Sequence, residues 1–210
     1  MPLEPAFVYG GGGHGRVLLD VIERQGRYRV VEVLDDCLAA GTMVSGVAVS
    51  GGRDRLAELG SHGIRAGVIA IGDNETRETL ADLASGAGLR FLQAIDPSGD
   101  IARGVPIGEG TFAARGAIVN VGCSVGAHVI LNTACTVDHD STVGPFAHLS
   151  PGVHVSGGCT IGARSHVGIG ASVAQGLVIG EDAIVGAGSV VLGDVSPGAT
   201  VVGVPAGPMH

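Results

Sequence analysis

The chain has 210 residues, of which 45% are apolar and only 3% aromatic, and its formal net charge is −8. The apolar content excludes a disordered chain, and the acidic balance argues against nucleic acid or an anionic membrane as a partner. All 12 basic residues are arginine, which excludes a Schiff-base or P-loop lysine. No apolar run reaches the ~18 residues of a membrane span, and no signal-peptide pattern opens the chain, so we expect a cytoplasmic protein.

The first half of the chain alternates between short apolar runs and amphipathic segments. Expected strands span residues 6–9, 30–34, 67–71 and 91–95, and expected helices span 16–24, 53–59 and 74–84. Asn74 is the expected N-cap of the last helix. This alternation predicts an α/β domain with a small parallel, Rossmann-like sheet. We place this domain at residues 1–97, because Asp96 and Pro97 begin a turn-rich boundary.

A glycine-rich turn, Gly10–Gly15, lies between the first expected strand and the first expected helix. Backbone amides at a helix N-terminus favour a phosphate group. The acidic pair Asp35 and Asp36 ends the second strand, where dinucleotide-binding folds place an acid that contacts a ribose hydroxyl. The domain is too short for a full dinucleotide fold, so the pattern favours a nucleotide or nucleotide sugar over NAD. A purely structural tight turn is the alternative.

A second polar segment, containing Gly72 and Glu75, follows the third expected strand. This position is the carboxyl edge of the sheet, where open α/β folds bind ligands. Helix capping accounts for the same residues, so a ligand contact and a purely structural role both stay open.

The second half is strictly periodic. Every sixth residue from Ile101 to Val191 is aliphatic, and pairs such as Val125-Gly126 and Val143-Gly144 add a period of 18. Three short strands per turn, stacked into a triangular column, explain both periods. The aliphatic residue and the small residue two positions before it then point inward, and the glycine beside the aliphatic residue lets the chain turn. We predict a parallel β-helix with a C-terminal tail over residues 98–210.

Three of the four cysteines, Cys123, Cys135 and Cys159, occupy the small inward position of their hexads. We therefore expect buried core thiols and no cysteine nucleophile.

Histidines supply the candidate chemistry of the predicted β-helix. Because Val137 points inward, His139 faces outward at a corner beside Asp140. A carboxylate raises the basicity of an imidazole, so this pair could be a general base and its support; a solvated polar corner is the alternative. His148 and His166, 18 residues apart, should stack on one face. Two ligands on one face do not complete a zinc site, so we predict no metal.

Together the two halves resemble the bacterial sugar acetyltransferase family, which includes sialic acid O-acetyltransferases and N-acetyltransferases of nucleotide-linked 4-amino-4,6-dideoxysugars. The resemblance covers nearly the whole chain. It rests on motifs at residues 9–15, 34–36, 70–77, 131–133, 137–140, 146–150 and 202–206.

The resemblance implies a left-handed β-helix of hexapeptide repeats and a homotrimer with acetyl-CoA between neighbouring β-helices. It implies His139 as the general base, supported by Asp140. The implied acetyl-CoA contacts are His148, Ile169 and Ala187. The implied nucleotide-sugar contacts are Gly12, Gly13, His14, Asp35, Asp36, Gly72 and Glu75.

The expected reaction is direct transfer of an acetyl group from acetyl-CoA to the amine of a nucleotide-linked aminosugar. Residues 1–97 would bind the nucleotide sugar and residues 98–210 would carry the acetyltransferase centre. Two alternatives stay open: O-acetylation of sialic acid or a related sugar, and a non-catalytic trimer that senses a nucleotide. The nucleotide base, the sugar stereochemistry and the glycan pathway are left open. Arg164 is the only basic residue after Arg115, which leaves few groups to hold the phosphates of CoA.

Overall fold

The computed structural model describes residues 3–209 of the chain. It divides into two compact units, Met1–Pro97 and Ser98–His210. No helix within the described residues has the length and apolar character needed to cross a membrane.

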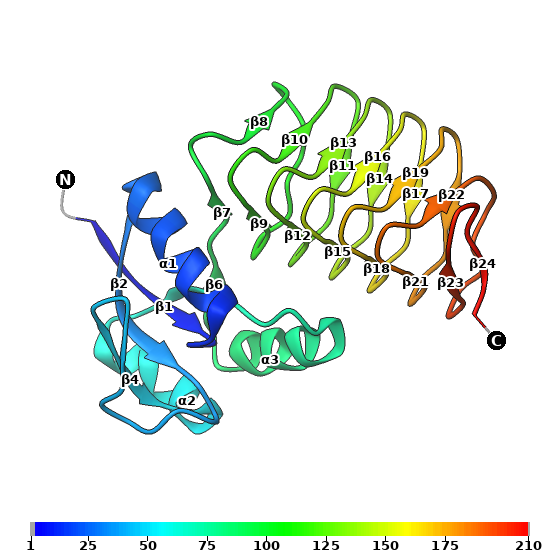
Figure 1. Ribbon diagram of the computed structural model, residues 1–210. Coiled ribbons are helices and arrows are strands. Elements are labelled where there is room, and N and C mark those ends of the chain that lie inside the picture. Colours follow the sequence, from blue (N-terminus) through cyan, green and yellow to red (C-terminus); the bar gives the residue numbers. More distant parts are fainter. Residues whose placement is uncertain (1–2, 210) are drawn as a thin grey trace. The chain divides into compact units, whose positions relative to one another are not determined.

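Within the described residues, the N-terminal unit (Figure 1) contains a sheet and three α-helices. The strand order of the sheet is β3-β4-β2-β1-β5-β6. The strands are β1 (Glu4–Tyr9), β2 (Tyr28–Leu34), β3 (Met43–Val44), β4 (Val47–Gly51), β5 (Ala66–Ile69) and β6 (Arg90–Phe91). All neighbours pair in parallel except β3 and β4. The helices are α1 (Gly13–Gln25), α2 (Leu56–Leu59) and α3 (Asn74–Gly86). The predicted small parallel sheet is confirmed.

Helix α1 forms because its apolar residues recur on one face, and Leu18, Val21 and Ile22 are buried. It ends at Gly26, whose φ of 66° lies in the left-handed region that glycine adopts without strain. The N–H of Gly26 donates to the carbonyls of Ile22 and Glu23, which satisfies part of the last turn.

Three details of this unit differ from the sequence prediction. The N-cap of α3 is Asp73, whose carboxylate accepts a hydrogen bond from the N–H of Thr76, and the helix continues to Gly86. The expected strand at 91–95 is two pieces, β6 and β7 (Ala94–Ile95), because the ladder to β5 ends at Leu92, whose N–H donates to Gly67. The hairpin of β3 and β4 was not predicted; its turn consists of Ser45 and Gly46, both with positive φ, as short hairpins require.

The C-terminal unit is a column of short strands in three sheets (Figure 1), and the strands pair in parallel except for β23 and β24. One sheet contains β8 (Asp100–Ile101), β10 (Ile118–Val119), β13 (Thr136–Val137), β16 (His154–Val155), β19 (Ser172–Val173) and β22 (Val190–Val191). The second contains β11 (Ser124–Val125), β14 (Thr142–Val143), β17 (Thr160–Ile161) and β20 (Val178–Ile179). The third contains β9 (Phe112–Ala113), β12 (Ile130–Leu131), β15 (His148–Leu149), β18 (His166–Val167), β21 (Ile184–Val185), β23 (Thr200–Val202) and β24 (Gly207–Pro208). From β8 to β22, paired residues are 18 apart, as Val119 and Val137 illustrate, which confirms the predicted period.

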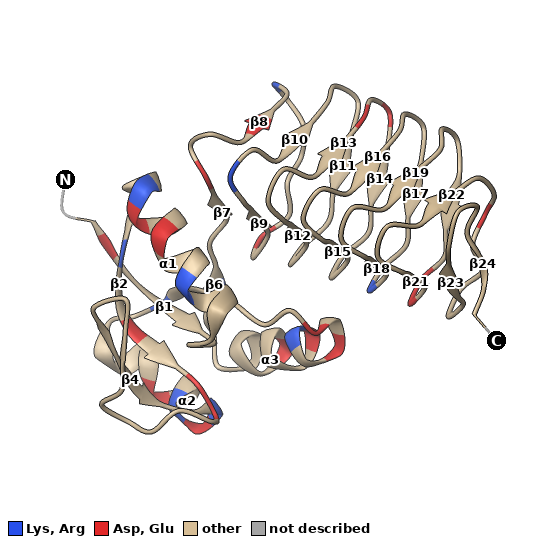
Figure 2. Cartoon of the chain, viewed as in Figure 1, with Lys and Arg blue, Asp and Glu red and all other residues tan. Residues whose placement is uncertain are grey.

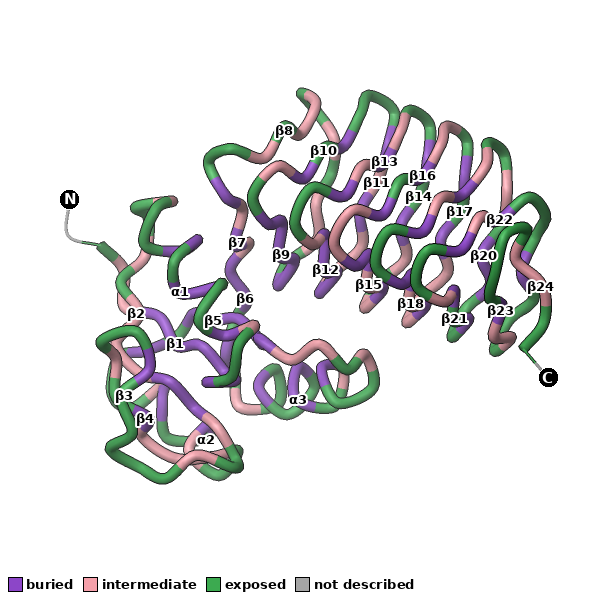
Figure 3. Tube along the Cα trace, in the orientation of Figure 1, coloured by how far each residue is buried: buried purple, intermediate pink, exposed green. Residues whose placement is uncertain are grey.

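The inside of the column is built as the hexads predict. The aliphatic positions from Ala113 to Val191 are all buried, and only Ile101 and Ile107, at one end, are half-buried. The small positions are buried as well, among them Cys135 and Ser165 at 0% exposure. Figure 3 shows the buried positions recurring from coil to coil.

The glycines beside the aliphatic positions do not make the turns, so that part of the prediction is wrong. Positive φ angles occur three residues after the aliphatic position, at Gly122 and Asp140 for example. The glycine next to the aliphatic residue is required because stacked coils approach closely. A Cβ on Gly162 would lie 2.4 Å from the backbone nitrogen of Glu181, one coil further on.

We therefore expect Gly162→Ala to destabilise the column, because the added methyl group meets backbone that cannot rotate away. Overpacking of this kind costs about 1–3 kcal/mol. Urea unfolding of Gly162→Ala and of Gly193→Ala measures the difference. Gly193 has no atom within 4 Å of its would-be Cβ, so equal destabilisation by both variants would contradict the steric explanation.

Candidate active site

The glycine-rich turn of the N-terminal unit contains two kinds of glycine. Gly10 and Gly15 are required by packing: a Cβ would lie 2.6 Å from the Ala70 carbonyl oxygen in one case and 1.8 Å from the Gly10 carbonyl oxygen in the other. Gly12 and Gly13 are exposed and have no atom within 4 Å of a would-be Cβ. The open backbone lies at the N-terminus of α1, where an anionic group is stabilised by the helix dipole and the first N–H groups.

Asp35 holds this turn in place. Its carboxylate accepts hydrogen bonds from the N–H groups of Gly11 (2.8 Å), Cys37 (2.8 Å) and Leu38 (3.0 Å). Burial raises the pKa of Asp35, but these N–H groups outweigh it and the net pKa is lowered. Asp35 therefore stays charged and connects the end of β2 to the turn next to Gly12.

Asp36 is engaged by Arg53, a residue that sequence reasoning missed. Its carboxylate accepts from Nη2 (2.6 Å) and Nε (3.0 Å) of Arg53 and from the Arg53 backbone N–H (2.9 Å). The hydrogen bond from the Arg53 side chain lowers the pKa of Asp36. The guanidinium is half-exposed. Arg53 follows β4 in the chain. A sequence analysis that predicted β4 would therefore have placed Arg53 at the carboxyl edge of the sheet.

Arg77 fixes the segment that contains Gly72. It is 1% exposed, and its Nη1 donates to the carbonyls of Ile71 (2.9 Å) and Gly72 (3.2 Å), while Nη2 donates to Asn74 Oδ1 (2.7 Å). Burial lowers the Arg77 pKa to about 10, so the side chain remains a cation at neutral pH. Glu75, in the first turn of α3, is exposed.

His14 is the first side chain of α1 to reach into this region. Burial, and then the charge of Arg77, lower its pKa to about 4. The imidazole is therefore neutral at pH 7, and any contact it makes with a ligand is that of a neutral ring.

In the β-helix, His139 and Asp140 lie on the turn between β13 and β14. Nδ1 of His139 lies 2.9 Å from Oδ2 of Asp140. Because a carboxylate only accepts hydrogen bonds, Nδ1 carries the proton and Nε2 is left with its lone pair. The side chain of His139 is 60% exposed, so this nitrogen is accessible. Asp140 has a φ of 59°, a conformation that aspartate tolerates better than most residues.

A second carboxylate, Asp138, holds the backbone of the same turn. Its Oδ1 accepts from the N–H of His139 (3.0 Å) and from Nδ2 of Asn120 (2.8 Å), one coil earlier. The pKa of His139 is raised by the hydrogen bond to Asp140 and then by the charge of Asp138. The sequence motif contains Asp138, but its bond to a residue 18 positions away could be found only from the coil register.

His148 and His166 stack on the third sheet, as predicted, with ring centroids 4.7 Å apart. Nδ2 of Asn132 lies 3.3 Å from Nε2 of His148, so the amide can donate a hydrogen bond to this nitrogen. His154 lies on the first sheet instead.

Ile169 and Ala187 occupy the corner that follows this sheet, on successive coils, and both are exposed. The N–H of Gly188 donates to the Ile169 carbonyl (2.8 Å). Within one chain, the structure therefore brings His139 and Asp140 together and brings Ile169 and Ala187 together, but it places the two pairs at different corners of the column.

Arg164 is committed to carboxylates of the next coil. Its Nε donates to Asp182 (2.8 Å), and Nη2 contacts Glu181 and Asp182. Charged residues are sparse along the coils (Figure 2). The buried thiols are confirmed as core residues, and burial raises the pKa of Cys135 to about 12. Within residues 3–209, no group of three or more His, Cys, Asp or Glu is arranged to hold a metal ion.

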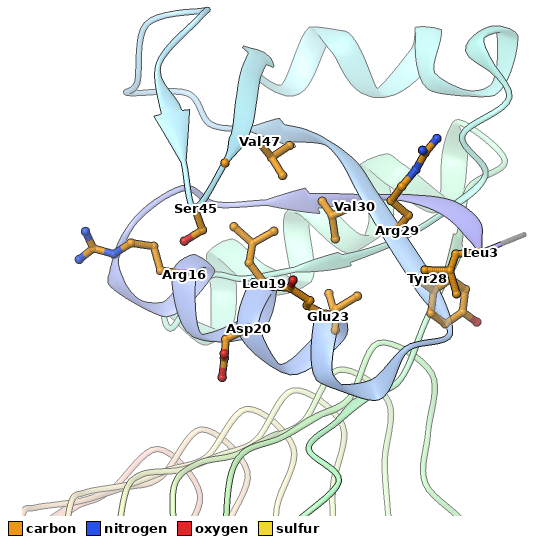
Figure 4. Close-up of a pocket in the computed structure, with 12 residues that line it drawn as sticks. Leu3, Arg16, Leu19, Asp20, Glu23, Tyr28, Arg29, Val30, Ser45 and Val47 are labelled. Atoms are coloured by element: carbon orange, nitrogen blue, oxygen red, sulfur yellow. The ribbon is translucent and has the colours of Figure 1, made fainter.

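A cavity of about 420 Å³ lies elsewhere on the N-terminal unit, between α1, β2 and the β3–β4 hairpin (Figure 4). Leu19 and Val30 line it together with the charged Arg16, Asp20 and Arg29. It contains none of the predicted site residues.

An α/β unit followed by a column of hexapeptide coils with an outward His–Asp pair defines a hexapeptide-repeat acyltransferase. Residues 6–83 match the family described as the PglD N-terminal domain. A perosamine N-acetyltransferase from Caulobacter crescentus, solved with CoA and GDP-perosamine, is 34% identical, with a TM-score of 0.96 over 100% of this chain and 98% of its own. Two structures of that enzyme carry a histidine replaced by asparagine or by alanine.

Two further solved structures are similar over nearly the whole chain. The acetyltransferase domain of PglB from Neisseria gonorrhoeae, in complex with acetyl coenzyme A, is 33% identical, with a TM-score of 0.92 over 99% of this chain and 100% of its own. WeeI from Acinetobacter baumannii is 28% identical, with a TM-score of 0.76 over 97% of this chain and 99% of its own. The chain belongs to the bacterial sugar acetyltransferase family, and its column is the left-handed β-helix of that family.

The lowered pKa of His14 predicts a pH dependence of stability. Between pH 6.5 and about 4 the unfolded chain binds a proton at His14 that the folded chain does not bind. Stability is therefore lost as the pH falls through this window, by up to about 3 kcal/mol. Urea unfolding at pH 7 and pH 4.5 should show a smaller loss for His14→Gln than for the wild type. His62→Gln, at an exposed position, is the control; an unchanged loss in His14→Gln would contradict the assignment.

Proposed function

We propose that this chain transfers the acetyl group of acetyl-CoA to the amine of a nucleotide-linked 4-amino-4,6-dideoxysugar. The observation that carries the proposal is the outward His139–Asp140 pair, 2.9 Å apart, on a chain whose N-terminal unit offers an open helix N-terminus. The similarity to an enzyme solved with CoA and GDP-perosamine supports both substrate classes.

In the proposed mechanism, the sugar amine attacks the thioester carbonyl while Nε2 of His139 takes its proton. The new C–N bond forms, the C–S bond breaks, and the thiolate of CoA leaves with the proton that His139 then returns. Asp140 keeps Nδ1 protonated and stabilises the imidazolium that forms in between. Backbone N–H groups or His148 would stabilise the oxyanion. Cys123, Cys135 and Cys159 are buried, and the proposed transfer is direct, with no acyl-enzyme.

The charges around His139 set the pH dependence of this step. The base must be unprotonated to act, and Asp140 and Asp138 raise its pKa. Activity should therefore fall as the pH drops through that raised pKa. Removal of the Asp140 charge should move the acid limb of the rate profile to lower pH.

We propose residues 1–97 as the nucleotide-sugar-binding domain. Gly12 and Gly13 supply open backbone for a phosphate, and Gly72 and Glu75 line the neighbouring segment. His14 contributes a neutral ring. The structure adds that Asp35 and Asp36 have carboxylate oxygens already bonded to protein donors, so each would contact the ligand with its remaining acceptor capacity.

We propose residues 98–210 as the acetyltransferase domain, with acetyl-CoA against His148, Ile169 and Ala187. These residues lie at a different place around the column from His139. One side of the column contains about six residues, so the chain can span at most ~20 Å along it. A second copy that brings its His139 to this surface would complete the site, which supports a homotrimer. Exposed Val121 and Leu192 offer apolar surface for such contacts. We place the reaction in cytoplasmic glycan biosynthesis.

A trimer should have three times the 20.8 kDa mass of one chain. Light scattering at the protein concentration of the activity assay measures this directly. A monomer mass in an active preparation would contradict the shared site.

His139→Ala should lower the rate of acetyl transfer by at least ~10²-fold, because general-base catalysis supplies about that factor. The assay follows thiol release from acetyl-CoA with GDP-, UDP- and dTDP-linked 4-amino-4,6-dideoxyhexoses. The control is His154→Ala, which removes another exposed histidine of the coils and should keep the wild-type rate. CMP-sialic acid and free sialic acid complete the panel, and turnover on these alone would replace N-acetylation by O-acetylation. Near wild-type turnover in His139→Ala would overturn the mechanism.

A further inference from the structure

One column of equivalent positions runs past the His139 corner at intervals of 18 residues. It contains Val121, His139, Gly157 and Gln175. Gly193 follows at the same spacing but on a shorter turn, because Ile179 pairs with Val195, only 16 residues further on. Valine and glutamine stand at this position on other coils, so the coil itself accepts a side chain there. Gly157 also lacks the positive φ that favours glycine elsewhere in the column. The backbone of its own coil therefore does not explain why residue 157 is glycine.

The explanation lies in the imidazole of His139. A Cβ on Gly157 would lie 2.7 Å from Cε1, 2.8 Å from Nε2 and 3.1 Å from Nδ1 of His139, and these are its three nearest atoms. Carbon atoms essentially do not approach this closely. The ring thus occupies the space that a side chain at residue 157 would fill. At Gly193, two coils further on, nothing lies within 4 Å of the would-be Cβ.

Asp140, the hydrogen-bond partner of the His139 ring, has little freedom to move with the ring if the ring is displaced. The backbone N–H of Asp140 donates to the Val121 carbonyl (3.1 Å), and the His139 carbonyl accepts from Gly158 (2.8 Å). On the other side of Asp140, a Cβ at Gly122 would lie 2.3 Å from Oδ1. The turn that carries His139 and Asp140 is therefore held by the coils before and after it. The position of the imidazole ring then depends on the residue next to the ring, Gly157.

We infer that Gly157 is a positioning residue for the acetyl-transfer centre: the absence of its side chain seats the His139 imidazole where Nδ1 meets Asp140. This inference rests on the proposed function, since it assigns a role to His139 as the base. A methyl group at residue 157 displaces the ring, breaks the 2.9 Å contact with Asp140 and moves Nε2 away from its place. The exposed ring can rotate, so the fold is retained.

The test compares Gly157→Ala with Gly193→Ala, which adds the same methyl group two residues after an inward valine, at a turn where space is open. In Gly157→Ala we expect kcat to fall about 10²-fold, the loss typical of an ångström-scale misplacement, with KM for acetyl-CoA unchanged. The acid limb of the rate profile should move to lower pH, as in Asp140→Asn. Gly193→Ala should match the wild type in kcat, in KM for acetyl-CoA and in the pH of the acid limb.

A second measurement does not depend on turnover. NMR titration of histidine-labelled full-length protein, with the His139 signal assigned by its loss in His139→Ala, should show a lower pKa of His139 in Gly157→Ala than in the wild type. An unchanged pKa with a raised KM would mean that Gly157 makes room for substrate, and it would overturn the inference. Absence of wild-type transfer on every substrate would refute the proposed function, while the titration would still decide the role of Gly157.

If Gly157→Ala unfolds, the double variant His139→Ala/Gly157→Ala decides. Removal of the ring should restore the thermal stability of His139→Ala, because the three atoms nearest to the added methyl group all belong to that ring. A double variant that remains unfolded would show that residue 157 must be glycine for the backbone, which contradicts the inference.

Discussion

The close approach of successive coils is the constraint on which the C-terminal unit depends. Glycines such as Gly126 and Gly144 allow backbone nitrogen atoms of the next coil to come within 2.6 Å of where a Cβ would be. This approach sets an 18-residue register that continues from β8 to β22. Because the register is strict, any two residues 18 apart on the surface become neighbours, and chemistry can be assembled by sequence spacing alone. The adjacent rings of His148 and His166, with centroids 4.7 Å apart, are one result.

The His139–Asp140 pair uses the same register in a different way. Neighbours in sequence rarely face each other in a strand, since their side chains alternate. Here Asp140 occupies the turn position with positive φ that most coils give to glycine, and this turn brings its carboxylate back to the preceding residue. The coil before supplies Asn120, which holds Asp138, and the coil after supplies the open surface at Gly157. A base on an exposed corner is thus oriented by three consecutive coils.

The sequence predicted most of this architecture because its signals are periodic and local. The hexads define the column, its buried thiols and the outward direction of His139. The alternation of apolar runs defines the sheet of the N-terminal unit. The prediction failed where the signal is short or distant. Asp73 and Asn74 are both good caps, and only the structure shows that Asp73 receives the N–H of Thr76. The β3–β4 hairpin gives too few residues for a strand pattern, so Arg53 was missed together with its ion pair to Asp36. The roles of Gly122 and Gly157 arise from contacts between coils.

Besides the turns that need a positive φ, glycine has three physical uses in this chain, and they can be told apart by what a Cβ would meet. Gly15 and Gly162 admit backbone and serve the fold. Gly12 and Gly13 face open space at the start of α1, where their bare backbone leaves the N–H groups accessible to an anion. Gly157 faces a side chain that has a proposed chemical role. Conformational freedom does not explain the choice of glycine at Gly12, Gly13 or Gly157, since none of these residues has a positive φ. At Gly12, Gly13 and Gly157, neither a positive φ nor packing against backbone explains the glycine, and each lies in a segment to which a chemical role is proposed.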